Sequence, residues 1–441
     1  MRRHRIGFIA VFAAGCLAAP VLRAQDRMTL QQFIDQAVQN SAAVEIAGEG
    51  VAGAGLKVRE AKSQYLPQVN LGSSYTRISL VQEFDIPNLG HFKFASPNNY
   101  NLRLGASEQV FTWGRVGKTV ELSRVGQDLA ENGVILTKQA LAYQVVPMFY
   151  GILFTQEAVK VVDQTLGSLN KKVAILEERY QAGLASDFDI SLLKVQVNGL
   201  EAQKLDFENT IRKLVLAYNR IAGRPLESPL VLEGDIDAEA AKSLEMLQAE
   251  SRGLLQEALE NRPEAQQNGN QRRLVQTQIA LAQTANKPNL IASFNYELRN
   301  GFLPSVDRIR GNWNAVLAVS YPLFDGHRTA AQVAQGQVAL RTVEEQRTDL
   351  EQAFALEIDQ SLSDLKTLAG RIEIEKAKIA HAERALAIAD ERYQRGLIST
   401  TDLVDAQDSL DAARLSSLQL RLNSVLGRYG LLKAAGRKIY S

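Results

Sequence analysis

The chain has 441 residues and is almost neutral, with 50 lysines and arginines against 49 aspartates and glutamates. This balance gives no general basic surface for nucleic acid, so we expect no nucleic-acid partner. The single cysteine excludes an internal disulfide and a cysteine metal site. Beyond residue 24 the histidines are His91, His327 and His381, which lie too far apart in sequence to predict a metal centre, and we expect no metal or cofactor.

Residues 1–24 have the pattern of a secretory signal peptide. Several arginines open the chain, Ile6–Ala19 is apolar, and small residues lead up to Ala24, where cleavage is expected. The apolar part is too short for a transmembrane helix. Cys16 follows Ala13-Ala14-Gly15, which resembles a bacterial lipoprotein cleavage box, although leucine is usual at the position of Ala13. Two routes of processing therefore remain open, cleavage after Ala24 and lipidation of Cys16.

A short pattern occurs twice and indicates that the chain consists of two repeats. Glu178–Asp189 reads ERYQAGLASDFD, and Glu391–Asp402 reads ERYQRGLISTTD. Gly223 matches Gly436 at the same spacing. Internal repeats of this kind indicate duplicated structural units. We expect a first repeat over 25–230, a linker over 231–252 and a second repeat over 253–441.

Each repeat is expected to contain a helix, two strands, a very long helix, a tight turn and a return helix. The long helices should run from about Gly114 to Gln181 and from about Gly326 to Arg395, because alanine, leucine, glutamine, glutamate and lysine dominate there. Each would be roughly 100 Å long at 1.5 Å per residue, which favours a coiled coil or a spanning tube over a globular domain. The apolar stretch Val145–Phe154 is too short to span a membrane and is expected to be buried packing between helices.

The repeated pattern predicts a helix reversal. Gly183 and Gly396 stand where a left-handed residue ends a helix. Ser186 and Ser399 would each cap the following helix, with an aspartate three residues later in the capping-box position. The sequence therefore predicts two helical hairpins per chain.

Two pairs of strands are expected, at about 69–110 and 289–322. In the second pair, apolar residues such as Leu290, Phe294 and Tyr296 alternate with polar ones such as Asn295 and Glu297. Strands of about ten residues with this alternation are typical of a membrane β-barrel, and they also fit half-buried hairpins in a soluble sheet. Four strands cannot close a barrel, and a sheet edge cannot face lipid. A membrane location would therefore require two, three or four copies of the chain.

At this point the chain resembles the TolC-like outer-membrane efflux channels. The resemblance covers nearly the whole mature chain and includes the two repeats, the Y-x-x-G-L turn in each half, and YPLFDGHR at Tyr321–Arg328 before a long helix. It implies a mainly α fold with a small membrane β-barrel. In it, three chains contribute four strands each to a 12-stranded outer-membrane barrel, and the helical hairpins form a periplasmic α-barrel.

The same resemblance implies the function and partners. The protein would be the passive exit duct of a tripartite efflux or type I secretion system, located in the outer membrane and extending into the periplasm. It would be a homotrimer in contact with outer-membrane lipid, and an inner-membrane transporter would drive transport through a periplasmic adaptor. The hairpin tips would dock that adaptor through Gly183, Leu184, Gly396 and Leu397.

The resemblance also implies an aperture at the hairpin tips. Tyr393, Asp402 and Asp405 match the residues that narrow it in the second repeat, and Asp189 matches their acidic partner from the first. Ile398 stands where a well-known member of the family has an arginine that ties hairpins together, and Arg395 is a nearby substitute for it. For Asp402 and Asp189 a helix cap is the competing interpretation, and for Asp405 a solvated helix face.

A soluble periplasmic coiled-coil scaffold or adaptor is the alternative function. An enzyme is not expected, because the sequence contains no phosphate-binding loop, nucleotide motif or nucleophile–base constellation.

Overall fold

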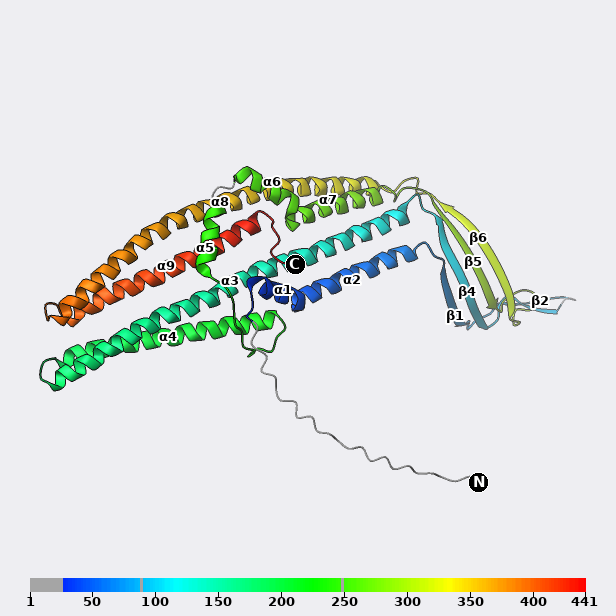
Figure 1. Cartoon of the computed structure of the whole chain (residues 1–441). Coiled ribbons are helices and arrows are strands. Elements are labelled where there is room, and N and C mark those ends of the chain that lie inside the picture. Colours follow the sequence, from blue (N-terminus) through cyan, green and yellow to red (C-terminus); the bar gives the residue numbers. More distant parts are fainter. Residues whose placement is uncertain (1–26, 88–89, 247–249) are drawn as a thin grey trace, which may run out of the picture.

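The computed structural model describes residues 27–87, 90–246 and 250–441 of an elongated molecule (Figure 1). Helices run along most of its length, and a twisted sheet lies at one end. The expected signal peptide, with Cys16 and Ala24, lies outside the described residues.

The first half follows the expected order of elements. These are α1 (Leu30–Asn40), α2 (Ala42–Ser63), β1 (Gln68–Arg77), β2 (Glu83–Ile86), β3 (Gly90–Lys93), β4 (Asn98–Phe111), α3 (Arg115–Gln181) and α4 (Asp187–Ile221). The short β2–β3 hairpin between β1 and β4 was not predicted from the sequence. It pairs only with itself and extends the end of the sheet that lies farthest from the helices (Figure 1).

The second half has the same order of helices and main strands. Its elements are α6 (Ser251–Asn261), α7 (Pro263–Ala282), β5 (Asn289–Arg299), β6 (Arg310–Ser320), α8 (Arg328–Gln394) and α9 (Thr400–Ala434). Both long helices, α3 and α8, have 67 residues, and both return helices, α4 and α9, have 35. The predicted bounds of the long helices are confirmed to within two residues. The segment expected to be a linker contains the short helix α5 (Ile236–Glu245), which packs on α9.

A close contact at the end of each return helix has the same form in the two halves. Gly223 and Gly436 have φ angles of 63° and 77°. A Cβ atom at Gly223 would lie 3.0 Å from the carbonyl oxygen of Asn40, and one at Gly436 would lie 3.0 Å from the backbone nitrogen of Arg262. Each glycine therefore lets its helix end rest against the backbone between the first two helices of its own half.

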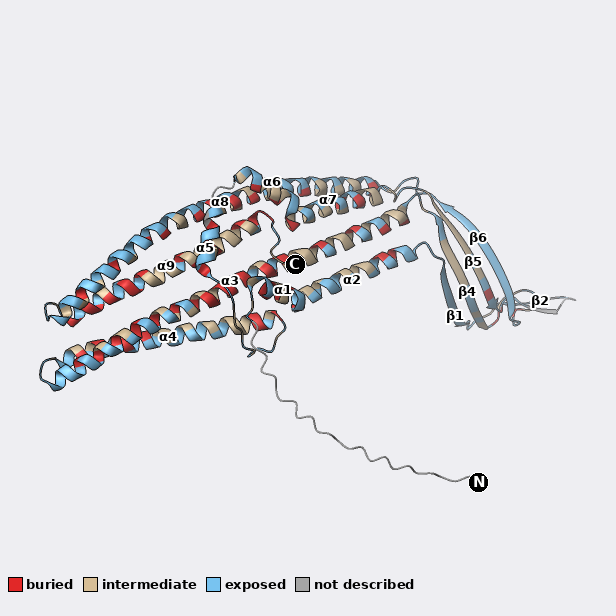
Figure 2. Ribbon diagram, viewed as in Figure 1, coloured by how far each residue is buried: buried red, intermediate tan, exposed pale blue. Residues whose placement is uncertain are grey.

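The four long strands form one antiparallel sheet in the order β1-β4-β5-β6. Its register joins apolar residues into one face, since Leu71 pairs with Leu104, Leu104 with Tyr296, and Tyr296 with Trp313. The next row along the strands is polar and pairs Gly72, Arg103, Glu297 and Asn312. Among the residues that the structure describes, β1 and β6 have no second neighbouring strand, and every residue of both strands is exposed (Figure 2).

The main apolar cluster lies where α1, α3, α4 and α9 meet. The rings of Phe33 and Tyr218 stack at a centroid distance of 3.5 Å, with Phe149 edge-on to Phe33. Val145 and Val146 belong to the same fully buried group, which confirms the expected packing role of this stretch. By length and composition, α3 contains a stretch that could cross a membrane, but the burial of these residues within the chain accounts for its apolar character.

Candidate functional site: the hairpin tips

The two reversing turns lie at the same end of the molecule, opposite the sheet (Figure 1). Gly183 and Gly396 have φ angles of 74° and 72°, as the sequence predicts. Leu184 N–H donates to the Arg179 carbonyl over 2.8 Å, and Leu397 N–H donates to the Arg392 carbonyl over 2.9 Å. A second bond in each turn runs from the glycine N–H to the carbonyl of the tyrosine three residues earlier. Both turns are therefore Schellman motifs, in which the left-handed glycine satisfies the last carbonyls of the helix.

The helix caps that follow the turns differ between the halves. Ser399 and Asp402 form a reciprocal capping box, in which Ser399 N–H donates to Asp402 Oδ2 over 2.9 Å and Asp402 N–H donates to Ser399 Oγ over 3.2 Å. The Ser399 hydroxyl also donates to Asp402 Oδ2 over 2.7 Å, and this bond together with that from Ser399 N–H holds the pKa of Asp402 below its ordinary value. Ser186 instead accepts only from Phe188 N–H, so the capping box expected at Asp189 does not form.

Asp189 is used in a contact between the two hairpins. Thr400 Oγ1 donates to Asp189 Oδ1 over 2.6 Å and lies 3.2 Å from the Tyr393 hydroxyl. Because a threonine hydroxyl has one hydrogen, which goes to the carboxylate, the Tyr393 hydroxyl donates to Thr400. Thr400 is buried, with 3% of its surface exposed. We call this chain of hydrogen bonds, Tyr393–Thr400–Asp189, the tip link.

Further contacts join the same two hairpins at positions farther from the turns than the tip link. Lys172 Nζ of α3 lies 2.7 Å from Asp390 Oδ1 of α8, and Thr165 Oγ1 of α3 donates to Asp411 Oδ1 of α9 over 2.9 Å. Val404 of α9 belongs to the apolar cluster of the first hairpin. The two hairpins of one chain are therefore held together by polar and apolar contacts in the part nearest the turns.

The row of aspartates on α9 is longer than the pair that the sequence predicted. Asp402 and Asp405 are exposed, and Asp408 and Asp411 continue the same three-residue spacing. Burial raises the pKa of Asp408, with the carboxylates of Asp411 and Asp405 adding to the rise, and burial also raises the pKa of Asp411. The spacing was visible in the sequence, but the family pattern drew attention only to the first two positions.

Three other residues of the tips, Arg395, Leu184 and Leu397, differ in their surroundings. Arg395 forms an ion pair with Glu391, four residues earlier, and among the described residues of the chain no second ion pair ties it to the first hairpin. Leu184 and Leu397 are 79% and 67% exposed, so each tip presents one apolar side chain to solvent.

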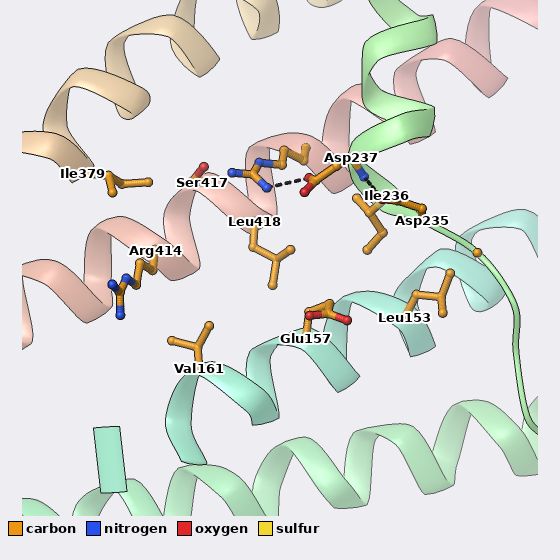
Figure 3. A pocket seen from close by; sticks show the side chains of 12 residues that line it. Leu153, Glu157, Val161, Asp235, Ile236, Asp237, Ile379, Arg414, Ser417 and Leu418 are labelled. Carbon is orange, nitrogen blue, oxygen red and sulfur yellow. Dashed lines mark hydrogen bonds and ion pairs between the residues drawn. The ribbon is translucent and has the colours of Figure 1, made fainter. Parts of the chain in front are cut away.

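A cavity of about 520 Å³ lies halfway along the helices, between α3, α9 and the segment that enters α5 (Figure 3). Leu153 and Val161 of α3 face Leu418 of α9 across it, and Arg421 donates to Asp237 at its edge. None of the expected site residues lines it. It lies between the main apolar cluster and the contacts near the tips.

Comparison with known proteins assigns the family. The family model described as "Outer membrane efflux protein" matches residues 33–224 and 254–437. The efflux pump outer membrane protein TtgC of Pseudomonas putida is 22% identical over 414 residues, covering 92% of this chain and 82% of that protein. The pyoverdine export outer membrane protein OpmQ of Pseudomonas aeruginosa is 23% identical over 344 residues, covering 77% of this chain and 70% of that protein.

Solved structures show the same fold. A crystal structure of CusC has a TM-score of 0.76 at 18% identity, covering 93% of this chain and 92% of that one. The outer membrane protein VceC of Vibrio cholerae has a TM-score of 0.73 at 20% identity, covering 93% of this chain and 96% of that one.

These matches favour an outer-membrane channel over the soluble scaffold that the sequence left open. The chain belongs to the outer membrane efflux protein family and acts in the outer membrane as an exit channel for efflux.

Proposed function

We propose that three copies of the chain form the passive exit duct of a tripartite exporter, driven by an inner-membrane transporter through a periplasmic adaptor. The observation that carries the proposal is the four-stranded sheet, which has one continuous apolar face and two unpaired edges. Lipid cannot satisfy the backbone groups of a sheet edge, so β1 and β6 must pair with other copies. Three copies give a closed 12-stranded barrel, as the TolC-like resemblance implies.

The helices extend the barrel into a tube. At 67 residues and 1.5 Å per residue, α3 and α8 would each reach roughly 100 Å from the sheet. The names of two relatives give different exported compounds, toluene for one and pyoverdine for the other. Such variety fits a duct that leaves the choice of cargo largely to the transporter behind it.

The exposed tips are the proposed docking points for the adaptor. Leu184 and Leu397 lie beside Gly183 and Gly396 at the ends of the hairpins, with nothing in the chain covering them. An exposed leucine at a rigid turn is suited to a partner that buries it.

The aperture is proposed to lie inside the ring of tips. The tip link and the Lys172–Asp390 ion pair hold the two hairpins of each chain together. Asp402 and Asp405 are exposed on one face of α9 and would face the lumen, with Asp402 keeping its cap contact to Ser399. The cavity between α3 and α9 would leave room for the hairpin ends near the turns to move while the main apolar cluster stays fixed.

The first prediction concerns assembly. The protein should remain with outer membranes after high-salt washing and should be a trimer by native mass measurement in detergent. Its unpaired strands and exposed apolar face require a membrane location and more than one copy, and the TolC-like resemblance implies three copies. A stable monomer that carries no detergent would contradict the proposal.

The second prediction concerns docking. The double variant Leu184→Glu/Leu397→Glu should bind the adaptor more than about tenfold more weakly, because burying one leucine contributes about 1.5–3 kcal/mol. Adaptor binding is measured by co-purification and export by cargo accumulation, with Leu226→Glu, an exposed leucine beyond the other end of α4, as the control. Normal export by the double variant would place the docking surface elsewhere.

The third prediction concerns the tip link. Thr400→Val keeps the side-chain shape but leaves Asp189 and the Tyr393 hydroxyl without their shared partner, at a cost of about 1–3 kcal/mol. Without an adaptor, channels of this variant in planar bilayers should show a higher single-channel conductance or should open more often. The control is Thr401→Val at the exposed neighbouring position. If the two variants conduct alike, the tip link does not hold the aperture closed.

The fourth prediction concerns the acidic face. Three chains would bring six carboxylates around one opening, and two charges about 6 Å apart in water repel by roughly 0.7 kcal/mol, so a multivalent cation is favoured there. A trivalent cation added from the helical side should block the parent channel, and Asp402→Asn/Asp405→Asn should lose most of the block.

The pH dependence of the block has a definite direction. Because Ser399 lowers the pKa of Asp402, part of the block should survive as the pH falls to the ordinary aspartate value of 3.8 and should disappear only below it. Asp364→Asn, at an exposed position halfway along α8, is the control. Equal block in the parent and the double variant would assign these residues to helix structure alone.

A further inference from the structure

The polar face of the sheet carries its charge at one end only. Within the four long strands, which the structure describes throughout, the charged residues on that face are Arg103, Glu297, Arg299 and Arg310. By register Arg299 and Arg310 lie at the end of the sheet farthest from the helices, and Arg103 and Glu297 lie two positions nearer its middle. The remaining positions on this face are small, amide or uncharged, for example Asn295 and Asn314, which hydrogen-bond to each other over 3.1 Å.

The register of β5 and β6 places two arginines directly opposite each other. Arg299 pairs with Arg310, whereas Arg103 pairs with Glu297. Like charges in directly opposed positions destabilise a sheet, so this pair is a cost to the fold.

One carboxylate cannot neutralise the three arginines. Glu297 is buried and lies 2.5 Å from Arg103, and its other oxygen is 3.6 Å from Arg299 Nε. Arg299 also lies over the Phe302 ring, 4.8 Å from its centroid. Among the residues that the structure describes, no carboxylate forms an ion pair with the exposed Arg310.

The surrounding loops do not cancel the excess. The β5–β6 loop contributes Asp307 and Arg308, which balance each other. Between the end of β1 and the start of β4, the sequence has two acids, Glu83 and Asp85, and one base, Lys93, so this segment offsets only one of the positive charges. This end of the sheet therefore keeps a net positive charge, which is carried by the arginines of the polar face.

We infer that Arg103, Arg299 and Arg310 make the outer end of the lumen a ring that attracts anions and favours exit of cargo bearing carboxylate or phosphate groups. The inference rests on the proposed function, because it requires the sheet to close with its polar face inward. Closure would place three copies of the cluster around one opening, where their fields add in a confined space. The duct then has an acidic inner end and a basic outer end.

The test is sided block of single channels in planar bilayers. The long, charged helices cannot cross the bilayer, so protein added to one chamber keeps its helices there and presents the outer end of the barrel to the other chamber. Tripolyphosphate is added to that opposite chamber. Tripolyphosphate should block the parent channel. Arg310→Gln should raise the half-blocking concentration by about tenfold, because it removes one positive charge per chain, three in all, from a single narrow opening.

Arg77→Gln is the matched control, because Arg77 lies at the same end of the sheet but on the opposite, apolar face by register. It should leave the block within about twofold of the parent. Channels that form normally but are not blocked by tripolyphosphate, or are blocked equally in the parent and Arg310→Gln, would overturn the inference while leaving the duct intact. Failure of the parent to form any channel would overturn the proposed duct and the inference together.

Discussion

The unpaired edges of the sheet are the constraint on which the rest of the molecule depends. β1 and β6 expose backbone donors and acceptors along their full length, and one face of all four strands is apolar. In water such a sheet would aggregate, and in lipid its edges could not be satisfied. The proposed closure with other copies would solve both problems. It would also make the helices that continue from the strands stand side by side as the wall of a tube.

A tube of long helices needs contacts that hold its inner end, far from the barrel. The main apolar cluster around Phe33, Phe149 and Tyr218 joins the helices near mid-length. Beyond the central cavity, the packing of Val404 and several polar contacts join the hairpins of one chain, namely the tip link, Lys172–Asp390, Thr165–Asp411 and Gln196–Asp408. These polar contacts are less costly to exchange than a packed core, because partner carboxylates and hydroxyls can turn to water when the hairpins separate.

Much of the fold could be predicted because its signals are local. Helix-forming composition defines α3 and α8, alternation defines the long strands, and Gly183 and Gly396 mark the turns. The β2–β3 hairpin was missed because its strands have only four residues each, too few to show a period. α5 was taken as linker because ten residues with an acidic first turn resemble a solvated connection.

The candidate site was only partly predictable, because its main contact joins residues far apart in the chain. The sequence pointed to Tyr393 and Asp189 through the family pattern, but not to Thr400 between them. A local pattern cannot reveal that a hydroxyl on one hairpin meets a carboxylate on the other. The one available signal was the repeat itself, since Thr400 in the second copy stands where the first copy has Asp187.

That difference between the copies explains how a duplicated turn makes a contact that neither copy makes alone. In the second copy Asp402 is occupied by its reciprocal cap with Ser399, so it cannot reach across. In the first copy Ser186 caps through the backbone of Phe188 only, which leaves the Asp189 carboxylate available. A threonine at the buried position 400 then supplies the donor that Asp187, as a carboxylate, could not. Two identical turns would have placed carboxylate against carboxylate, so divergence at this one position turns a repulsive pair into a hydrogen bond.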